Sequence, residues 1–437
     1  MTEPTPRPER LEPAIATVPP DTVTQPRRVI AGGISWRRTF AAFRHRNYRL
    51  WFAGQLVSLT GTWMQSAAQG FLVYNLTHSS AFLGSVAFAS GLPAWLFTLF
   101  GGVLADRAER RKLMLATQSA LMVLAFVLAG LVFSGAVQPW HIIVLAFMTG
   151  TASAFETPSR QSLVVDLVGQ EDMTNAIALN TTLYNTGMIV GPAVAGAVYA
   201  LAGPAWCFAV NGLSYLAVIV ALALMQLQPH PAPEKRPPVL EAIAEGIRYV
   251  RGHVLVRSLT LSAFFYIIFD YAMIIFTPAF AVSLLNGGAD VNGLLLAANA
   301  AGAVIGGLLL AVLAGRFGRG KIWAISATVT PWMIAAFAFS RSLPLSLLLT
   351  GVVGVTSITV MNNVNALIQS SVPDELRGRV MSLYSLMFVS GGPLSSLALG
   401  LISDRLGVEA LVLVCAALAA GFALWVRLGA SAIRGMR

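Results

Sequence analysis

The chain has 437 residues, of which 56% are hydrophobic and only 11% are charged, and its mean hydropathy is +0.71. About a quarter of the residues in a soluble globular protein are charged, so this composition excludes an ordinary soluble domain and predicts that lipid surrounds most of the chain. The formal net charge of +10 does not indicate a nucleic-acid partner, because the basic residues gather at the ends of apolar runs and form no stripe interleaved with aromatic residues.

Residues 1–40 are rich in proline, polar and charged residues. They contain no short apolar segment followed by a cleavage site, so we expect a disordered cytoplasmic tail rather than a signal peptide.

Runs without charge then mark the membrane spans, since a helix needs about 20 apolar residues to cross a bilayer. Three runs are each long enough for two spans: those between Arg49 and Asp106, Lys112 and Glu156, and Asp172 and Glu234. After Arg257, six single-span runs follow at 258–284, 291–315, 322–340, 342–368, 380–403 and 410–426. The sequence therefore predicts an all-α membrane protein with about twelve transmembrane helices.

Nearly all the basic residues fall on one side of this predicted topology. Of the 29 lysines and arginines, only Arg341 and Arg405 lie in loops opposite the termini. Because basic loops stay in the cytoplasm, we expect both termini to be cytoplasmic and the protein to lie in the cytoplasmic (inner) membrane of a bacterium.

A linker divides the chain after the sixth predicted span. Residues 227–256 contain five prolines and then VLEAIAEGIRYVRGH, in which Leu240, Ile243, Ile247 and Val250 recur at helical spacing. This pattern predicts an amphipathic helix at the membrane surface, between a six-helix bundle at 41–226 and a second bundle at 257–437.

The two halves share motifs at a near-constant offset. The segment ADRAERRK (105–112) aligns with AGRFGRGK (314–321), and the Gly-Pro pair at 191–192 aligns with the pair at 392–393. Such a parallel repeat predicts two lobes with a pathway between them.

These motifs resemble those of the major facilitator superfamily. GGVLADRAERRK (101–112) is similar to its signature between spans two and three, although Glu109 stands where glycine is usual. FRHRNYRLWFAGQLVSLTGTWMQ (43–65), FETPSRQSLVVDLVGQEDMTNAIALN (155–180) and PDELRGRVMSLYSL (373–386) resemble the enterobactin-exporter-like branch of drug and siderophore efflux proteins. The resemblance implies the major facilitator fold, with two pseudo-symmetric six-helix bundles.

The signature loop predicts a gate. A carboxylate at Asp106 could accept hydrogen bonds from the N-terminal end of a neighbouring helix, which the resemblance suggests is span eleven, beginning near Arg377. The second copy has Gly315 at the matching position, so we expect an asymmetric latch that holds the outward-facing state. The charged residues assigned to this gate are Asp106, Arg107, Arg110, Arg111 and Arg377.

Two further features are candidate gate elements. Glu156 and Arg160 are spaced for an ion pair at the cytoplasmic end of span four, although solvated loop charges would also explain them. In span five, GMIVGPAVAG includes Gly191 and Pro192, which allow close helix approach and a bend. It resembles a motif of exporters in the superfamily, and packing between the lobes is a compatible interpretation.

Asp270 is the only ionisable group near the centre of a predicted span. A carboxylate there is costly, and burial opposes its charged form, so it could carry a coupling proton or bind a cationic group. A structural hydrogen bond, with Tyr266 one turn away as a candidate partner, is the alternative.

Uncharged polar residues within spans could line a substrate path, although hydrogen bonds between helices would explain some of them. The candidates are Gln65, Gln69, Tyr184, Tyr266, Asn362 and Asn363.

No phosphate-binding loop, metal-spaced histidine pair or catalytic triad is recognisable, so we expect no enzyme activity, cofactor or metal. The two cysteines, Cys207 and Cys415, are expected to pack in apolar runs. We predict a monomeric secondary exporter of small amphipathic molecules, siderophore-like or drug-like, driven by a proton gradient. Macrolide or multidrug efflux without a siderophore role, and a non-transporting scaffold or sensor, are the alternatives.

Overall fold

The computed structural model describes residues 40–107, 109–169, 171–225 and 239–429, so the predicted N-terminal tail and the proline-rich part of the linker lie outside the described residues. In chain order these residues form η2 (Ala41–Arg44), α2 (Arg46–Thr77), α3 (Ser80–Arg107), α4 (Arg110–Phe133), α5 (Pro139–Leu167), α6 (Met173–Ala202), α7 (Pro204–Leu224), α8 (Val239–Gly252), α9 (Val254–Ile275), α10 (Thr277–Ser283), α11 (Ala289–Phe317), α12 (Arg319–Phe339), α13 (Leu343–Ser371), α14 (Asp374–Leu406) and α15 (Val408–Gly429). No strand occurs among them, which confirms the all-α prediction.

Twelve of these described helices are long, with 21 to 33 residues each. Nine helices in the described ranges are long and apolar enough to cross a membrane. The helices α2, α5 and α15 are not among the nine, and the polar side chains of α5 include Glu156, Arg160 and Asp166. The protein is therefore a multi-pass membrane protein, and the count of twelve spans stays a prediction.

One predicted span is broken in the structure. The run 258–284 was expected to be a single helix, but α9 ends at Ile275 and α10 begins at Thr277, with Phe276 (φ −92°, ψ 7°) between them. Pro278 occupies the first turn of α10, and a proline has no backbone N–H and clashes with the preceding helical turn. The prediction of one continuous helix was wrong for this reason.

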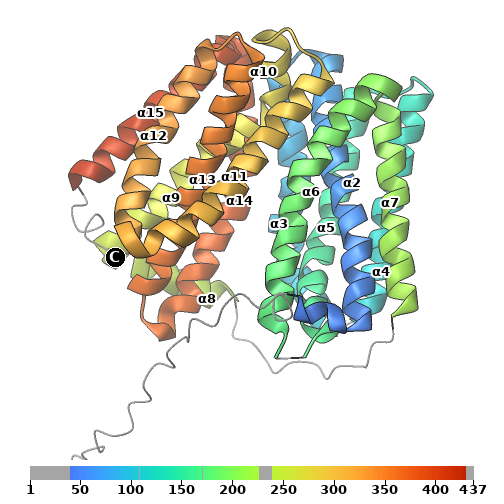
Figure 1. Cartoon of the computed structure of the whole chain (residues 1–437), viewed down its shortest axis with the longest axis horizontal. Coiled ribbons are helices and arrows are strands. Elements are labelled where there is room, and N and C mark those ends of the chain that lie inside the picture. Colours follow the sequence, from blue (N-terminus) through green and yellow to red (C-terminus); the bar gives the residue numbers. More distant parts are fainter. Residues whose placement is uncertain (1–39, 108, 170, 226–238, 430–437) are drawn as a thin grey trace, which may run out of the picture. The chain divides into compact units, whose positions relative to one another are not determined.

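The helices pack as two sets, coloured blue to green and yellow to red in Figure 1. In the first set (α2–α7), α2 packs on α6 and α7, α3 on α5, and α4 on α7. In the second set (α9–α15), α13 packs on α11 and α12, and α12 packs on α15. The most extensive contacts between the sets join α3 to α14 and α6 to α11. The domain boundaries predicted from the sequence remain a proposal.

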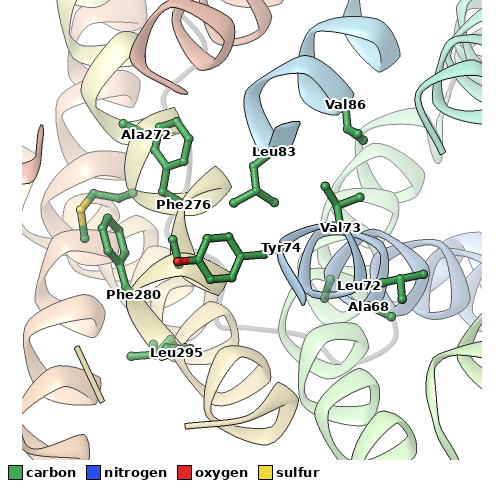
Figure 2. Packing of buried hydrophobic residues seen from close by; sticks show 14 of the residues in the cluster. Ala68, Leu72, Val73, Tyr74, Leu83, Val86, Ala272, Phe276, Phe280 and Leu295 are labelled. Carbon is green, nitrogen blue, oxygen red and sulfur yellow. The ribbon is translucent and has the colours of Figure 1, made fainter. Parts of the chain in front are cut away.

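The two ends of the helices differ in how the sets are joined. We call the end that carries Arg341 and Arg405 the arginine-poor end, and the opposite end the arginine-rich end. At the arginine-poor end one apolar core contains residues of both sets, including Tyr74, Leu83 and Phe276. Figure 2 shows these three side chains gathered from α2, α3 and the junction of α9 with α10.

Towards the arginine-rich end the apolar cores are separate. Trp51, Met114 and Leu163 belong to a cluster formed only by residues up to Met225. Trp323 and Val364 belong to a cluster formed only by buried residues from Val250 onwards. Among the described clusters of buried apolar residues, only the one at the arginine-poor end contains members of both sets.

Backbone contact without intervening side chains brings the sets together at the arginine-poor end. A Cβ atom added to Gly84 of α3 would lie 2.1 Å from the carbonyl oxygen of Ser396 in α14. One added to Gly293 of α11 would lie 2.4 Å from the carbonyl oxygen of Pro192 in α6. Both distances are shorter than any contact a carbon atom can make, so only glycine fits.

The helix α8 lies where the amphipathic helix was predicted, and it packs on α14 and α9. Glu245 forms an ion pair with Arg379 of α14, and Val250 is buried. Ile247 is 39% exposed, so its neighbour Val250, rather than Ile247, provides the described apolar contact. The side chains of Leu240 and Ile243 lie outside the described residues.

Candidate functional site

A buried ion pair lies inside the first set of helices. The guanidinium Nε of Arg160 is 3.1 Å from the Oε1 atom of Glu156, one turn away on α5. The two side chains are only 15% and 12% exposed. Charges removed from water are costly unless they are paired, so this pair is a strong candidate for a functional role.

The pair lies within α5 and not at its end. The helix continues through Pro158 to Leu167. At 1.5 Å per residue, Glu156 is about 16 Å and Arg160 about 10 Å from this end of the helix. The position of the pair at the cytoplasmic end of the membrane span stays a prediction.

Aromatic side chains lie near the pair. Tyr184 of α6 and Tyr215 of α7 are close enough to Glu156 for its charge to act on their hydroxyl groups. Tyr184 is 39% exposed, and its ring meets that of Trp63 edge to face at 5.6 Å. The hydroxyl of Tyr215 is 3.3 Å from Oγ1 of Thr62. The site therefore combines two opposite charges with aromatic surfaces, one of which is accessible.

Amide groups complete the polar interior of the first set. Asn211 Nδ2 donates to Gln65 Oε1 at 2.7 Å, and Ser214 Oγ donates to Asn211 Oδ1 at 3.0 Å. Gln65 and Asn211 are both buried, so this contact ties α2 to α7. Gln69, one turn further along α2, is partly exposed.

The polar candidates in the second set are mostly buried and hydrogen-bonded. The Tyr266 hydroxyl donates to Thr330 Oγ1 at 2.7 Å and lies 3.3 Å from Ser357 Oγ, so it links α9 to α12 and α13. Asn363 is fully buried and donates to the Thr359 carbonyl at 3.0 Å, and its Oδ1 atom has no hydrogen-bond partner among the described residues. Asn362 is exposed. These contacts favour the structural alternative for Tyr266.

The contacts that are described for three of the gate arginines lie within their own set. Arg110 pairs with Asp166 of α5 at 2.5 Å, and Arg111 donates to the Ala223 carbonyl of α7 at 2.9 Å. Arg377 is exposed and its Nε donates to the Gln369 carbonyl at 3.0 Å. The side chains of Asp106, Arg107 and Asp270 lie outside the described residues, so their assigned roles stay predictions.

The predicted close packing around Gly191 and Pro192 has a defined partner. A Cβ atom on Gly191 would lie 2.5 Å from Cβ of Trp63 in α2, and the carbonyl of Pro192 faces Gly293 of α11. The motif thus lets α6 approach both a helix of its own set and a helix of the other set.

A second cluster of charges, which the sequence did not indicate, ties the start of α2 to the start of α6. The Oδ2 atom of Asp172 lies 2.6 Å from Nε of Arg44 and 2.8 Å from Nε2 of His45. The hydrogen bond with His45, with a contribution from Arg44, holds the pKa of Asp172 below its usual range.

The sequence also did not single out Asp404, at the end of α14. Its carboxylate contacts Ser79, Ser80 and Ala81 at the start of α3.

Within the described ranges no three His, Cys, Asp or Glu residues come together as a metal site.

Comparisons with known proteins agree with this architecture. A family model described as transmembrane secretion effector matches residues 37–434. The staphyloferrin A transporter of Staphylococcus aureus is 23% identical over 364 residues, which cover 82% of this chain and 90% of that protein. The multidrug efflux pump Tap of Mycolicibacterium fortuitum is 27% identical over 353 residues, covering 77% and 84%. The enterobactin exporter EntS of Shigella boydii is 24% identical over 401 residues, covering 89% and 92%.

A solved structure shares the fold. The bacterial homolog of the human lysosomal transporter Spinster, in an inward-facing and unoccupied conformation, superposes with a TM-score of 0.68 at 14% identity, and the match covers 92% of this chain and 97% of that one. The likeness shows the transporter fold that the sequence motifs predicted.

Proposed function

Because this chain belongs to the transmembrane secretion effector family of the major facilitator superfamily, we propose that it exports small amphipathic molecules from a bacterial cell by alternating access. In this mechanism two lobes close around a central path at one membrane face while the path is open at the other face.

The observation that carries the proposal is the difference between the two ends. Among the residues whose side chains are described, the sets share one apolar core at the arginine-poor end and have separate cores towards the arginine-rich end. An alternating-access transporter needs such an asymmetry, because only one end is closed at a time. A scaffold has no need of it.

The charge bias supports an orientation for this asymmetry. Only Arg341 and Arg405 lie in loops at the arginine-poor end, so the arginine-rich end and both termini face the cytoplasm in our proposal. The structure then represents a state closed towards the outside. We propose that the chain works as a monomer, because both sets of helices and the contacts between them belong to one chain.

The Glu156–Arg160 pair is the favoured coupling site in the described chain. Protonation of Glu156 would neutralise the carboxylate and leave Arg160 as an uncompensated buried cation. Such a pair can tie proton uptake to a change in helix packing or to binding of an anionic group. Asp270 remains the second candidate for the same task.

The surroundings of this pair suit an amphipathic ligand. Trp63 and Tyr184 offer aromatic surface, and the Glu156–Arg160 pair offers one group of each charge. Relatives named for staphyloferrin A, enterobactin and multidrug export make siderophore-like and drug-like molecules the first ligands to test. Macrolide efflux without a siderophore role is the second candidate, because a macrolide efflux protein of Streptococcus pyogenes is 25% identical over 370 residues.

Inverted membrane vesicles provide the test. With an imposed proton gradient, vesicles holding this protein should accumulate enterobactin, staphyloferrin A or a macrolide, and accumulation should stop when the gradient is collapsed. Glu156→Gln should lower gradient-driven accumulation at least tenfold, whereas Glu409→Gln, which alters a half-exposed pair with Arg341, should leave it unchanged. Accumulation of no ligand would favour the scaffold or sensor, and accumulation without a gradient would exclude proton coupling.

A further inference from the structure

Backbone N–H groups in the first turn of α3 donate hydrogen bonds to side-chain oxygens, one of which belongs to a residue of the other set. The first N–H groups of any helix lack partners within the helix. Here the N–H groups of Ser80 and Ala81 donate to Oδ1 of Asp404 at 2.7 and 3.2 Å, and the N–H of Phe82 donates to Oγ of Ser79 at 3.3 Å. Asp404 lies in the last turn of α14, in the second set.

Ser79 completes this contact. Its hydroxyl accepts a hydrogen bond from the backbone N–H of Phe82 and donates one to Oδ2 of Asp404. Both oxygens of the carboxylate are therefore used. A carboxylate at a helix N-terminus is stabilised both by charge-assisted hydrogen bonds and by the positive end of the helix dipole.

Close packing of α3 against α14 continues along the two helices beyond the Asp404 carboxylate. A Cβ atom on Gly400 of α14 would lie 2.6 Å from the carbonyl oxygen of Ser80, and one on Gly91 of α3 would lie 2.1 Å from Cγ of Pro393. The two helices thus touch along several turns, and Asp404 lies at the outer end of this contact. When the arginine-poor end opens, α3 and α14 must part, and these hydrogen bonds must break.

We propose that Asp404 is a gating residue, whose carboxylate fastens the first turn of α3 to the end of α14 and so holds the arginine-poor end closed. The inference rests on the alternating access proposed above. Together with the role predicted for Asp106 at the other end of α3, it gives this helix pair one carboxylate latch at each end, carried by opposite helices.

The test is the accessibility of a buried core position. Leu83, which is 3% exposed in the core shared by both sets, is replaced by cysteine, and its rate of reaction with a maleimide is measured on the purified full chain. The native Cys207 and Cys415 are buried, and the protein without Leu83→Cys gives the background rate. Labelling reports opening without requiring transport, so its outcome is separate from that of the export assay.

Asp404→Asn should raise the labelling rate about two- to fivefold, because it removes the charge but keeps an acceptor. Asp404→Ala should raise it about tenfold or more. Glu409→Gln, at the same end but paired with Arg341 inside the second set, is the matched control and should change nothing. An unchanged rate in Asp404→Ala would overturn the proposal.

A cross-link covers the case in which Asp404→Ala does not fold. In the triple variant Ser79→Cys, Asp404→Cys and Leu83→Cys, oxidation should join α3 to α14, because the side chains of Ser79 and Asp404 are in contact. The cross-linked protein should not label at Leu83→Cys, and reduction should restore labelling to the rate of the uncross-linked protein. Labelling that continues at full rate in the cross-linked protein would show that this end opens elsewhere.

Discussion

Replacing Gly84 by alanine tests whether the contact between α3 and α14 controls the arginine-poor end. An added Cβ atom would lie 2.1 Å from the carbonyl oxygen and 2.8 Å from the carbonyl carbon of Ser396. Both atoms belong to the backbone, so no side-chain rotation can relieve the clash. A carbon atom approaches a carbonyl oxygen to about 3.3 Å, so the helices must separate by roughly 1.2 Å.

This separation destabilises only the conformation in which the arginine-poor end is closed. Overpacking in a close contact destabilises by about 1–3 kcal/mol. The contact exists only while the arginine-poor end is closed, so the ratio of outward-open to outward-closed molecules should rise about 5- to 150-fold.

Distances between spin labels would measure this ratio. Gln161 in α5 and Ser370 in α13 are exposed, lie towards the arginine-rich end and belong to different sets. Labels on cysteines at these positions should show a population with a shorter separation in Gly84→Ala, because closing the arginine-rich end accompanies opening of the other end. Cys207 and Cys415 are buried and should stay unlabelled.

A matched glycine separates loss of stability from a change of conformation. A Cβ atom on Gly302 would lie 2.0 Å from the carbonyl oxygen of Gly351, and both residues lie in the second set. Gly302→Ala should therefore lower the unfolding temperature without changing the distance distribution. If Gly84→Ala gave the same distribution as Gly302→Ala, the α3–α14 contact would not be the closing element.

Two further variants test the remaining contacts. Tyr266→Phe should lower stability by about 0.5–1.5 kcal/mol through loss of the hydrogen bond to Thr330 and should leave export unchanged. Loss of export with an unchanged unfolding temperature would instead indicate that Tyr266 lines the substrate path. Asp172→Asn should be less stable than the wild type above about pH 4, because the pKa of Asp172 is lower in the folded chain than in the unfolded chain. The ionised carboxylate therefore stabilises the fold at pH values above its unfolded-state pKa, and this stabilisation disappears as pH falls through its folded-state pKa. The difference in unfolding midpoint between Asp172→Asn and the wild type should therefore vanish below that range, and a difference that persists there would exclude the carboxylate as its cause.

Some of the candidate site could be found from the sequence, and the limits have physical causes. The spacing of Glu156 and Arg160 predicted their pair, because one helical turn brings them together whatever surrounds the helix. The sequence does not show how far α5 continues beyond the pair, because a buried ion pair interrupts a charge-free run just as a loop does. Asp404 left no signal, since its partners at the start of α3 are more than 300 residues away.

The sequence by itself determined the helices, the repeat, the charge asymmetry and the family, because each follows from residues close together in the chain and from the difference between lipid and water as solvents. Only the tertiary structure showed at which end one described apolar core joins the two sets, that Gln65 and Tyr266 are held by neighbouring helices, and that Asp404 reaches α3. An alternating-access protein has several states of similar free energy with the same helices. Hydropathy and spacing are identical in all of them, so contacts between the two sets are the feature that distinguishes one state from another.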